Sequence, residues 1–281
     1  MGAFSAWRQR TFNVRGHLVG VFEIIPNNPT SPIPVVICPG WVEVPESWLW
    51  HAERMAELGR RVIAYDLPHG LPFTRNGTNL GEYAIELEKM ETLVAVMQAL
   101  EVDRADLIGR SEGAIWALLT ALYYPHMVRN IVLQNPAGLI GKDRLFPFLI
   151  RWLRDKKQTV WNETGDPKPY APISAWSVMA RQGLKTAQEI LAIMHTDSRH
   201  ALRMVAASGI KVGVVTTDED QLFPVKRIRK NTAGLTDAFI ELRGGHTSFF
   251  CRAEEFAEAI VRILESLERR DADGQNERRS T

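Results

Sequence analysis

Short apolar runs alternate with longer amphipathic segments along most of the chain, and this alternation constrains the fold more than any other sequence feature. The runs at 34–38 (PVVIC), 60–66 (RRVIAYD) and 105–109 (ADLIG) have the length and apolar character of strands buried on both faces of a sheet. The segments 45–59 and 81–100 place apolar residues at helical spacing. Strands joined by helical crossovers form a parallel sheet with helices on both faces, so the sequence predicts an α/β fold.

The alternation continues towards both ends of the chain. The remaining strands are expected within 10–25 (two strands joined at Arg15-Gly16), 128–135, 211–217 and 237–243, and the remaining helices at 111–124 and 253–268. The alternation ends there, because the last segment, 269–281, is polar and almost without apolar residues, which predicts disorder.

One segment interrupts the alternation. Between 137 and 205 the sequence shows no strand, and two helical stretches flank a proline-containing loop. A helical insertion after a strand can cover the carboxyl edge of a sheet, where ligands of α/β proteins bind. We therefore expect a core domain of 1–136 and 206–268 with a helical cap of 137–205. The cap aromatics either line an apolar cavity or hold the cap onto the body: Phe146, Phe148, Trp152, Trp161 and Trp176.

Composition argues against several classes of function. With 34 basic and 33 acidic residues and no extended basic patch, the chain has no electrostatic footprint for nucleic acid. Its two cysteines, Cys38 and Cys251, are far apart and lack metal-ligand spacing, so we expect reduced thiols and no metal site. No window reaches the roughly 18 apolar residues of a membrane span, and the first residues lack signal-peptide features, which predicts a cytoplasmic protein. Nothing in the sequence indicates an oligomeric state.

The segment 107–116 (LIGRSEGAIW) places Ser111 between Gly109 and Gly113, where a strand passes into a helix. A serine hydroxyl becomes a nucleophile when a base removes its proton, and it must stand clear of the sheet to meet both base and substrate. A sharp strand-to-helix turn achieves this, and it brings together the positions on either side of the serine, where a β-carbon would clash. The same turn directs the backbone N–H of Glu112 towards a developing oxyanion.

This arrangement resembles the α/β-hydrolase fold family over roughly residues 10–268. The stretch VDRADLIGRSEGAIWALLTALYYP is similar to the family's nucleophile turn and following helix, and ELGRRVIAYDLPHG is similar to its strand and Asp-x-Pro loop. The resemblance implies a mostly parallel, eight-stranded sheet flanked by helices. It also implies a catalytic triad in the chain order serine, acid, histidine.

The histidine implied by the resemblance is His246. It stands in LRGGHTSFF, directly after the last expected strand and before the C-terminal helix. Gly244 and Gly245 precede it and give the loop backbone a wide choice of conformations. The other six histidines lack this context.

The acid implied by the resemblance lies in VGVVTTDEDQLFP. Alignment on Pro224 places it at Asp220, with Asp218 as the alternative. Some family members carry the acid after the strand that precedes the cap. Asn135 stands there in this chain, and an amide cannot carry the negative charge that orients the histidine.

A second oxyanion donor is expected in the loop CPGWVEVPESW. Family members carry His-Gly where this chain has Pro39-Gly40; the glycine that lets the backbone approach substrate is kept, and the N–H of Trp41 is the expected donor. The alternative is a plain Pro-Gly turn. Arg110 either contacts an anionic substrate or pairs with Glu112 or the cap. The side chains considered for a substrate pocket are those of Trp41, Arg110, Trp152 and Trp176.

A serine nucleophile limits the reaction class. Relatives that open epoxides or displace halide use an aspartate at this position, so Ser111 disfavours those reactions. The sequence predicts a cofactor-free serine hydrolase that acts on a carboxylic ester or related small, apolar acyl compound. Lactones, thioesters, C–C bonds and cofactor-free perhydrolysis are lesser alternatives. A small-molecule receptor with slow or no turnover is the alternative from another class.

Overall fold

A computed structural model describes residues 7–67, 84–162 and 188–279, and it builds them around one sheet of eight strands. The strand order is β1-β2-β4-β3-β5-β6-β7-β8; β2 pairs antiparallel with β1 and β4, and all other neighbours are parallel. The predicted α/β fold with a mostly parallel sheet is confirmed. The strands are β1 (Arg8–Val14), β2 (His17–Ile24), β3 (Val35–Cys38), β4 (Val62–Tyr65), β5 (Ala105–Arg110), β6 (Val128–Gln134), β7 (Lys211–Thr217) and β8 (Ala238–Leu242).

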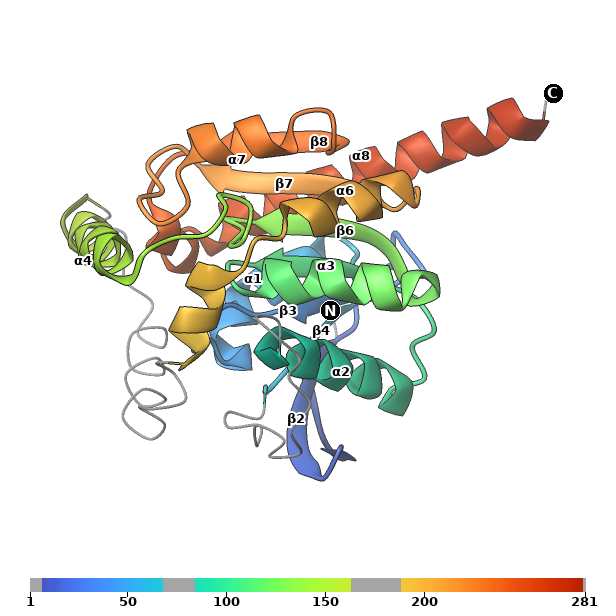
Figure 1. The fold of residues 1–281 in the computed structure, drawn as a ribbon. Coiled ribbons are helices and arrows are strands. Elements are labelled where there is room, and N and C mark those ends of the chain that lie inside the picture. Colours follow the sequence, from blue (N-terminus) through green and yellow to red (C-terminus); the bar gives the residue numbers. More distant parts are fainter. Residues whose placement is uncertain (1–6, 68–83, 163–187, 280–281) are drawn as a thin grey trace.

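Helices cover both faces of the sheet (Figure 1). In β3, Val35 and Ile37 pack into the core under α1 (Leu49–Glu57) and α8 (Ala253–Arg279). Val36 and Cys38 pack into the core on the other face, under α2 (Ala84–Ala99) and α3 (Gly113–Tyr123). Alternate residues of a strand point to opposite faces, so a strand covered on both sides is apolar throughout. The helices of the two layers are α1 (Leu49–Glu57), α2 (Ala84–Ala99), α3 (Gly113–Tyr123), α6 (Arg199–Ala207), α7 (Val225–Thr232) and α8 (Ala253–Arg279).

The segment between β6 and β7 is helical wherever the structure describes it. It contains α4 (Leu145–Asn162), a helix over 188–195 and α6, while 163–187, with Trp176, lies outside the described residues. Leu202 and Val205 of α6 belong to the core that α3 shares, so this helix runs across the expected boundary at 205. The division of the chain into core and cap stays a prediction.

Two segments differ from the sequence-based expectations. The sequence analysis does not predict α7, because its eight residues (VKRIRKNT) are mostly charged or polar and only Ile228 and Thr232 are buried. Disorder is expected from 269, yet α8 continues to Arg279. Alanine, glutamate, glutamine and arginine in this polar tail are favourable helix residues, so the helix that begins on the sheet extends past it (Figure 1).

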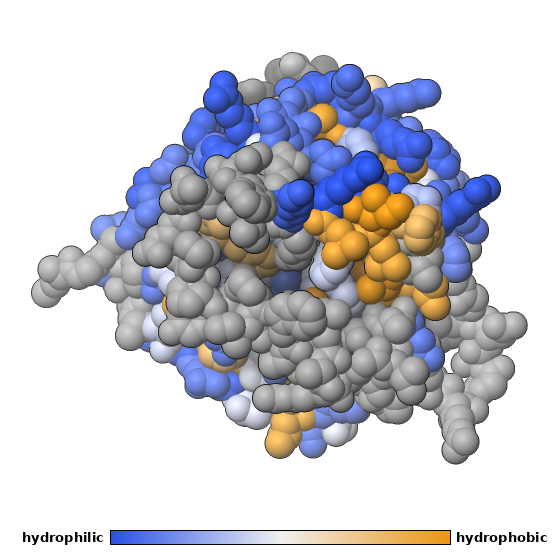
Figure 2. All heavy atoms as spheres, turned by 90° about the vertical axis from the view of Figure 1, so that its left-hand side faces the viewer, coloured by the Kyte–Doolittle hydropathy of each residue, from blue (hydrophilic) through white to orange (hydrophobic). Residues whose placement is uncertain are grey.

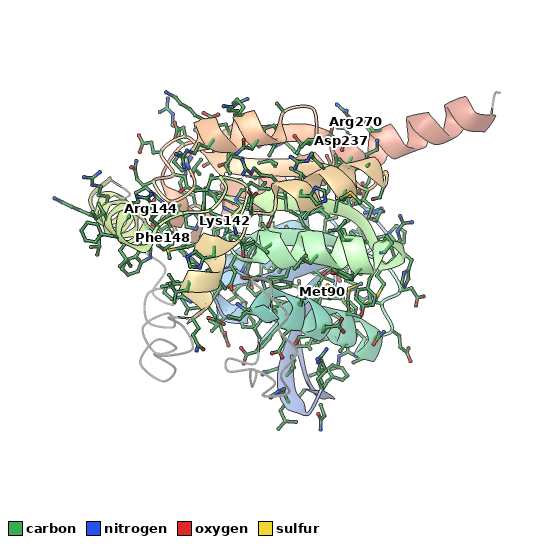
Figure 3. The ribbon with its side chains drawn as sticks, in the orientation of Figure 1. Met90, Lys142, Arg144, Phe148, Asp237 and Arg270 are labelled. Atoms are coloured by element: carbon green, nitrogen blue, oxygen red, sulfur yellow. The ribbon has the colours of Figure 1, made fainter. Side chains whose placement is uncertain are left out.

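An apolar surface lies on the outer side of α4. Phe146, Leu149 and Leu153 are exposed there, and Figure 2, which views this end of the molecule, shows apolar side chains gathered at the surface. Phe148 points the other way and is buried in the core that also contains Met90 of α2 (Figure 3). Phe146 is therefore exposed at the surface rather than packed into the core. Among the described helices, none is both long and apolar enough to cross a bilayer.

Candidate active site

Ser111 lies at a sharp turn between β5 and α3. Its φ of 51° is in the left-handed region, which is strained for a residue with a β-carbon. A β-carbon at Gly109 would lie 2.7 Å from the Cα of Ala114, and one at Gly113 would lie 2.6 Å from the carbonyl carbon of Cys38. Both contacts are with backbone atoms that cannot move aside. The two glycines are therefore what allows the turn to close.

The structure brings Ser111, His246 and Asp220 together in one hydrogen-bonded series. His246 Nε2 lies 3.1 Å from Ser111 Oγ, and His246 Nδ1 lies 2.9 Å from Asp220 Oδ2. All three residues are buried, with exposed fractions of 8%, 5% and 3% for Ser111, His246 and Asp220. His246 begins the short helix η4 (His246–Phe250) after β8, and Gly244 precedes it with a φ of 109°. A hydroxyl, an imidazole and a carboxylate in this order can move a proton away from the hydroxyl.

Donors on several sides hold the Asp220 carboxylate. Oδ1 accepts the backbone N–H groups of Leu222 and Phe223, each at 2.8 Å, and Oδ2 accepts the Asn135 side-chain amide at 2.7 Å. The alternative acid, Asp218, is turned elsewhere, and its Oδ1 accepts the N–H of Gly244 at 2.9 Å. Of the two candidates, Asp220 is therefore the carboxylate in contact with His246.

Trp41 and Glu112, the expected oxyanion donors, lie in neighbouring segments. The loop after β3 passes against the start of α3, because a β-carbon on Gly113 would also meet the carbonyl oxygen of Pro39 at 2.7 Å. Neither the Trp41 N–H nor the Glu112 N–H donates a hydrogen bond to a described residue. Both donors are therefore available to a ligand, and the Glu112 N–H stands at the positive end of α3.

Glu43, which the sequence analysis missed, shapes the loop that carries Trp41. Its Oε2 accepts the Gly40 N–H at 2.9 Å and the Trp48 indole N–H at 3.0 Å. Its Oε1 pairs with the guanidinium of Arg110, and both residues are buried. Nothing local marks a single loop glutamate as important, because its partner lies 67 residues further along the chain.

Arg110 is directed into the protein rather than standing open for substrate. Besides Glu43, it contacts His246, whose carbonyl oxygen accepts a hydrogen bond from Nη2 at 3.1 Å, and its guanidinium lies over the rings of Phe249 and Phe250 at 4.4 and 4.8 Å. Burial lowers the pKa of Arg110 to about 9, against the opposing effects of Asp220 and Asp155. These contacts do not include the expected pair with Glu112, whereas Asp155, whose charge acts on Arg110, belongs to the segment expected to form the cap. A contact with an anionic substrate stays a prediction.

The Glu112 side chain belongs to a separate buried group of charges. It pairs with Lys89 of α2, and the Lys89 ammonium also lies 3.3 Å from Glu189. Burial raises the pKa of Glu112 to about 7, and the pKa of the neighbouring Glu86 is well above its usual range because that side chain is also fully buried. Lys89 and several carboxyl groups thus form a buried cluster that includes Glu112, the residue after Ser111.

The remaining pocket candidates give a mixed result. Trp41 and Trp152 are half-buried and pack against the core under α2 and α3, on the same side as Phe148. The side chain of Trp161 lies outside the described residues, as does Trp176. Within the described part of the chain, no group of histidine, cysteine, aspartate and glutamate side chains is arranged to hold a metal ion.

Comparison with known proteins agrees with the fold described above. Residues 33–164 match the family model described as the alpha/beta hydrolase fold, and solved structures of that fold superpose on most of the chain. The chain therefore has the α/β-hydrolase fold.

Two curated relatives match shorter parts of the chain. It is 36% identical over 108 residues to 2-hydroxy-6-oxo-2,4-heptadienoate hydrolase of Pseudomonas putida, a match that covers 38% of each chain. It is 30% identical over 99 residues to bifunctional epoxide hydrolase 2 of Mus musculus, which covers 35% of this chain and 18% of the mouse protein.

Two solved structures show how far the fold is shared. A variant of the meta-cleavage product hydrolase CumD has a TM-score of 0.67 at 18% identity, covering 91% of this chain and 97% of the other chain. A lipase described as putative, from Acinetobacter baumannii AYE, has a TM-score of 0.68 at 15% identity, covering 94% and 93%. These likenesses extend the shared fold beyond the residues that the family model matches.

Proposed function

We propose that this α/β hydrolase transfers an acyl group to water through a covalent intermediate on Ser111. The observation that carries the proposal is the hydrogen-bonded series from Ser111 through His246 to Asp220. As Ser111 Oγ attacks the acyl carbonyl, His246 Nε2 takes its proton and then gives it to the leaving group. A water molecule, deprotonated by the same nitrogen, hydrolyses the acyl-enzyme and restores Ser111.

Asp220 and two backbone groups complete the proposed machinery. The Asp220 carboxylate accepts a hydrogen bond from the Nδ1–H of His246, which fixes the tautomer and stabilises the imidazolium. The N–H groups of Trp41 and Glu112 are proposed to bind the oxyanion, supported by their lack of a hydrogen-bond acceptor among the described residues. Ser111 provides no carboxylate for the alkyl-enzyme ester that epoxide opening requires, so the similarity to an epoxide hydrolase does not extend to that reaction.

A carboxylic ester with an apolar acyl group is the proposed substrate class. The apolar packing of Trp41, Phe148 and Trp152 on the side of the sheet under α2 and α3 supports an apolar acyl chain. Hydrolysis of a C–C bond is the second candidate, because several relatives are named as hydrolases of 2-hydroxy-6-oxo-dienoates or related compounds. Lactones and thioesters would use the same steps, and perhydrolysis would replace water with peroxide.

A fluorophosphonate probe and a substrate series test the proposal together. Labelling of the wild type that disappears in Ser111→Ala, with turnover of p-nitrophenyl esters reduced roughly 10⁴-fold or more in the variant, is the expected result. Turnover of a 2-hydroxy-6-oxo-dienoate above that of every ester in a graded chain-length series would favour the C–C candidate. A thermal shift with ligands but no labelling and no turnover would favour a receptor and contradict the proposal.

A further inference from the structure

We propose that Asp155 of α4 is a positioning residue for His246, and that it makes the proton transfer at Ser111 depend on where α4 sits. This inference rests on the proposed function, because it assigns to His246 the role of base. Asp155 lies in the insertion between β6 and β7, 91 residues before His246, and its side chain is fully buried. It touches none of the reacting atoms, so any effect on the reaction must pass through His246.

Asp155 contacts the backbone of His246 and the side chain of the next residue, Thr247. Its Oδ1 accepts the His246 N–H at 2.6 Å, and its Oδ2 accepts the hydroxyl of Thr247 at 3.0 Å. The two bonds use both oxygens of one carboxylate on two consecutive residues of η4. Hydrogen bonds to a charged acceptor are roughly twice as strong as those between neutral groups, and burial strengthens them further.

A second charged side chain holds the other end of the same residue. The Nη2 of Arg110, next to Ser111, donates to the His246 carbonyl oxygen at 3.1 Å. The main chain of His246 is thus held at its N–H by α4 and at its carbonyl by the nucleophile turn. Its ring is held separately by Ser111 and Asp220. The backbone contacts set the position of the His246 Cα, and the contacts with Asp220 and Ser111 then set the orientation of the ring.

The helix α4 packs against η4, the short helix that begins with His246. Of the described elements, η4 is the one that α4 packs against most closely. Phe148 and Asp155 are buried, seven residues apart and therefore on one side of the helix, while Phe146 and Leu153 are exposed. A shift of α4 would pull on the His246 N–H directly. A misplacement of about 1 Å in a catalytic group can reduce turnover by about 100-fold.

Three variants separate positioning from simple support of the fold. Asp155→Ala removes both hydrogen bonds, Asp155→Asn keeps an oxygen for the His246 N–H without the charge, and Thr247→Val removes only the hydroxyl contact. We expect kcat for a p-nitrophenyl ester to fall about 10- to 100-fold in Asp155→Ala with KM nearly unchanged. Asp155→Asn should recover part of the loss, and Thr247→Val should stay close to wild type. The rate of fluorophosphonate labelling should follow the same order.

The outcomes distinguish the inference from the proposed function. A folded Asp155→Ala that is labelled at the wild-type rate, or that changes KM alone, would overturn the inference while leaving Ser111 as the nucleophile. If Asp155→Ala does not fold, Asp155→Asn decides: slower labelling at an unchanged thermal midpoint supports positioning, and the wild-type rate overturns it. A wild type in which Ser111 is not labelled at all would overturn both proposals.

Discussion

Asn135 and His246 contact the same oxygen of Asp220. The Asn135 amide nitrogen lies 2.7 Å from Oδ2 and the His246 Nδ1 lies 2.9 Å from it, while Asn135 also donates to Thr217 Oγ1 at 2.8 Å. A carboxylate oxygen that accepts from an amide is fixed in direction, so Asn135 orients the carboxylate that contacts His246. The position after β6, where the sequence argument required a negative charge that asparagine lacks, therefore carries a hydrogen-bond donor.

Asn135→Asp should damage this arrangement more than Asn135→Ala. The new carboxylate would face Asp220 at hydrogen-bond distance, and two such groups share one proton, which weakens the charge available to His246. We expect kcat/KM for an ester to fall about tenfold in Asn135→Ala and clearly further in Asn135→Asp at pH 7. Equal activity of Asn135→Asp and wild type would show that Asn135 does not control the acid.

Asp220→Asn and Asp218→Asn form a matched pair for the choice of acid. Asp220→Asn should lose about 10⁴ in kcat while the protein remains folded, because the amide favours the wrong tautomer of His246. Asp218 contacts the Gly244 N–H, a bond that the oxygen of an asparagine can also accept, so Asp218→Asn should keep most of its activity. Steady-state ester hydrolysis with a thermal melt for each variant is the measurement. The reverse order of activities would contradict the assignment of Asp220.

The two glycines around Ser111 allow a test of the turn itself. In Gly113→Ala the new β-carbon would collide with the backbone of Cys38, so the end of β3 or the start of α3 must shift. We expect a loss of several kcal/mol in the free energy of unfolding, measured by urea denaturation. Gly20→Ala in β2 is the control, because its β-carbon would meet nothing closer than 3.6 Å, and it should change stability by less than about 1 kcal/mol. Comparable losses in both variants would argue against a special demand at Gly113.

Most strands of the sheet and three residues of the candidate site, Ser111, His246 and Asp220, could be predicted from the sequence. The short apolar runs gave the strands because burial on both faces leaves a continuous signal, and the glycine spacing around Ser111 marked the turn. His246 and Asp220 were predicted from the resemblance to the α/β-hydrolase fold family, which places them after β8 and β7, and the structure brings both into hydrogen-bonded contact in one series with Ser111. Asp155, Glu43 and Lys89 were not found, because each acts through a partner far along the chain and a single polar residue in a helix or loop has no periodicity. The helix α7 was missed for a related reason: only Ile228 and Thr232 of its eight residues are buried, which is too few to show an apolar pattern at helical spacing.

The buried carboxyl group of Glu86, close to Glu112 and Lys89, should make the free energy of unfolding depend on pH. Glu86 is fully buried on α2, and both of its carboxylate oxygens lack a hydrogen-bond partner among the described residues. Burial, together with the charges of Glu112 and Glu189, raises the pKa of Glu86 well above its usual 4.5 despite the opposing charge of Lys89. The folded protein therefore binds a proton at Glu86 more tightly than the unfolded chain does.

Glu86→Gln should stabilise the protein at alkaline pH more than at acid pH. A carboxyl whose pKa is raised by folding favours the folded state below its unfolded pKa, and this contribution is lost as pH rises through the folded pKa. Glutamine does not titrate, so the difference in the free energy of unfolding between variant and wild type should grow between pH 5 and pH 8, by up to about 1.4 kcal/mol for each pH unit that lies below the folded pKa of Glu86. Urea denaturation at the two pH values measures it. Glu101→Gln, at an exposed position after α2, is the control and should show the same difference at both. A Glu86→Gln difference that does not grow with pH would mean that Glu86 is ionised in the folded protein.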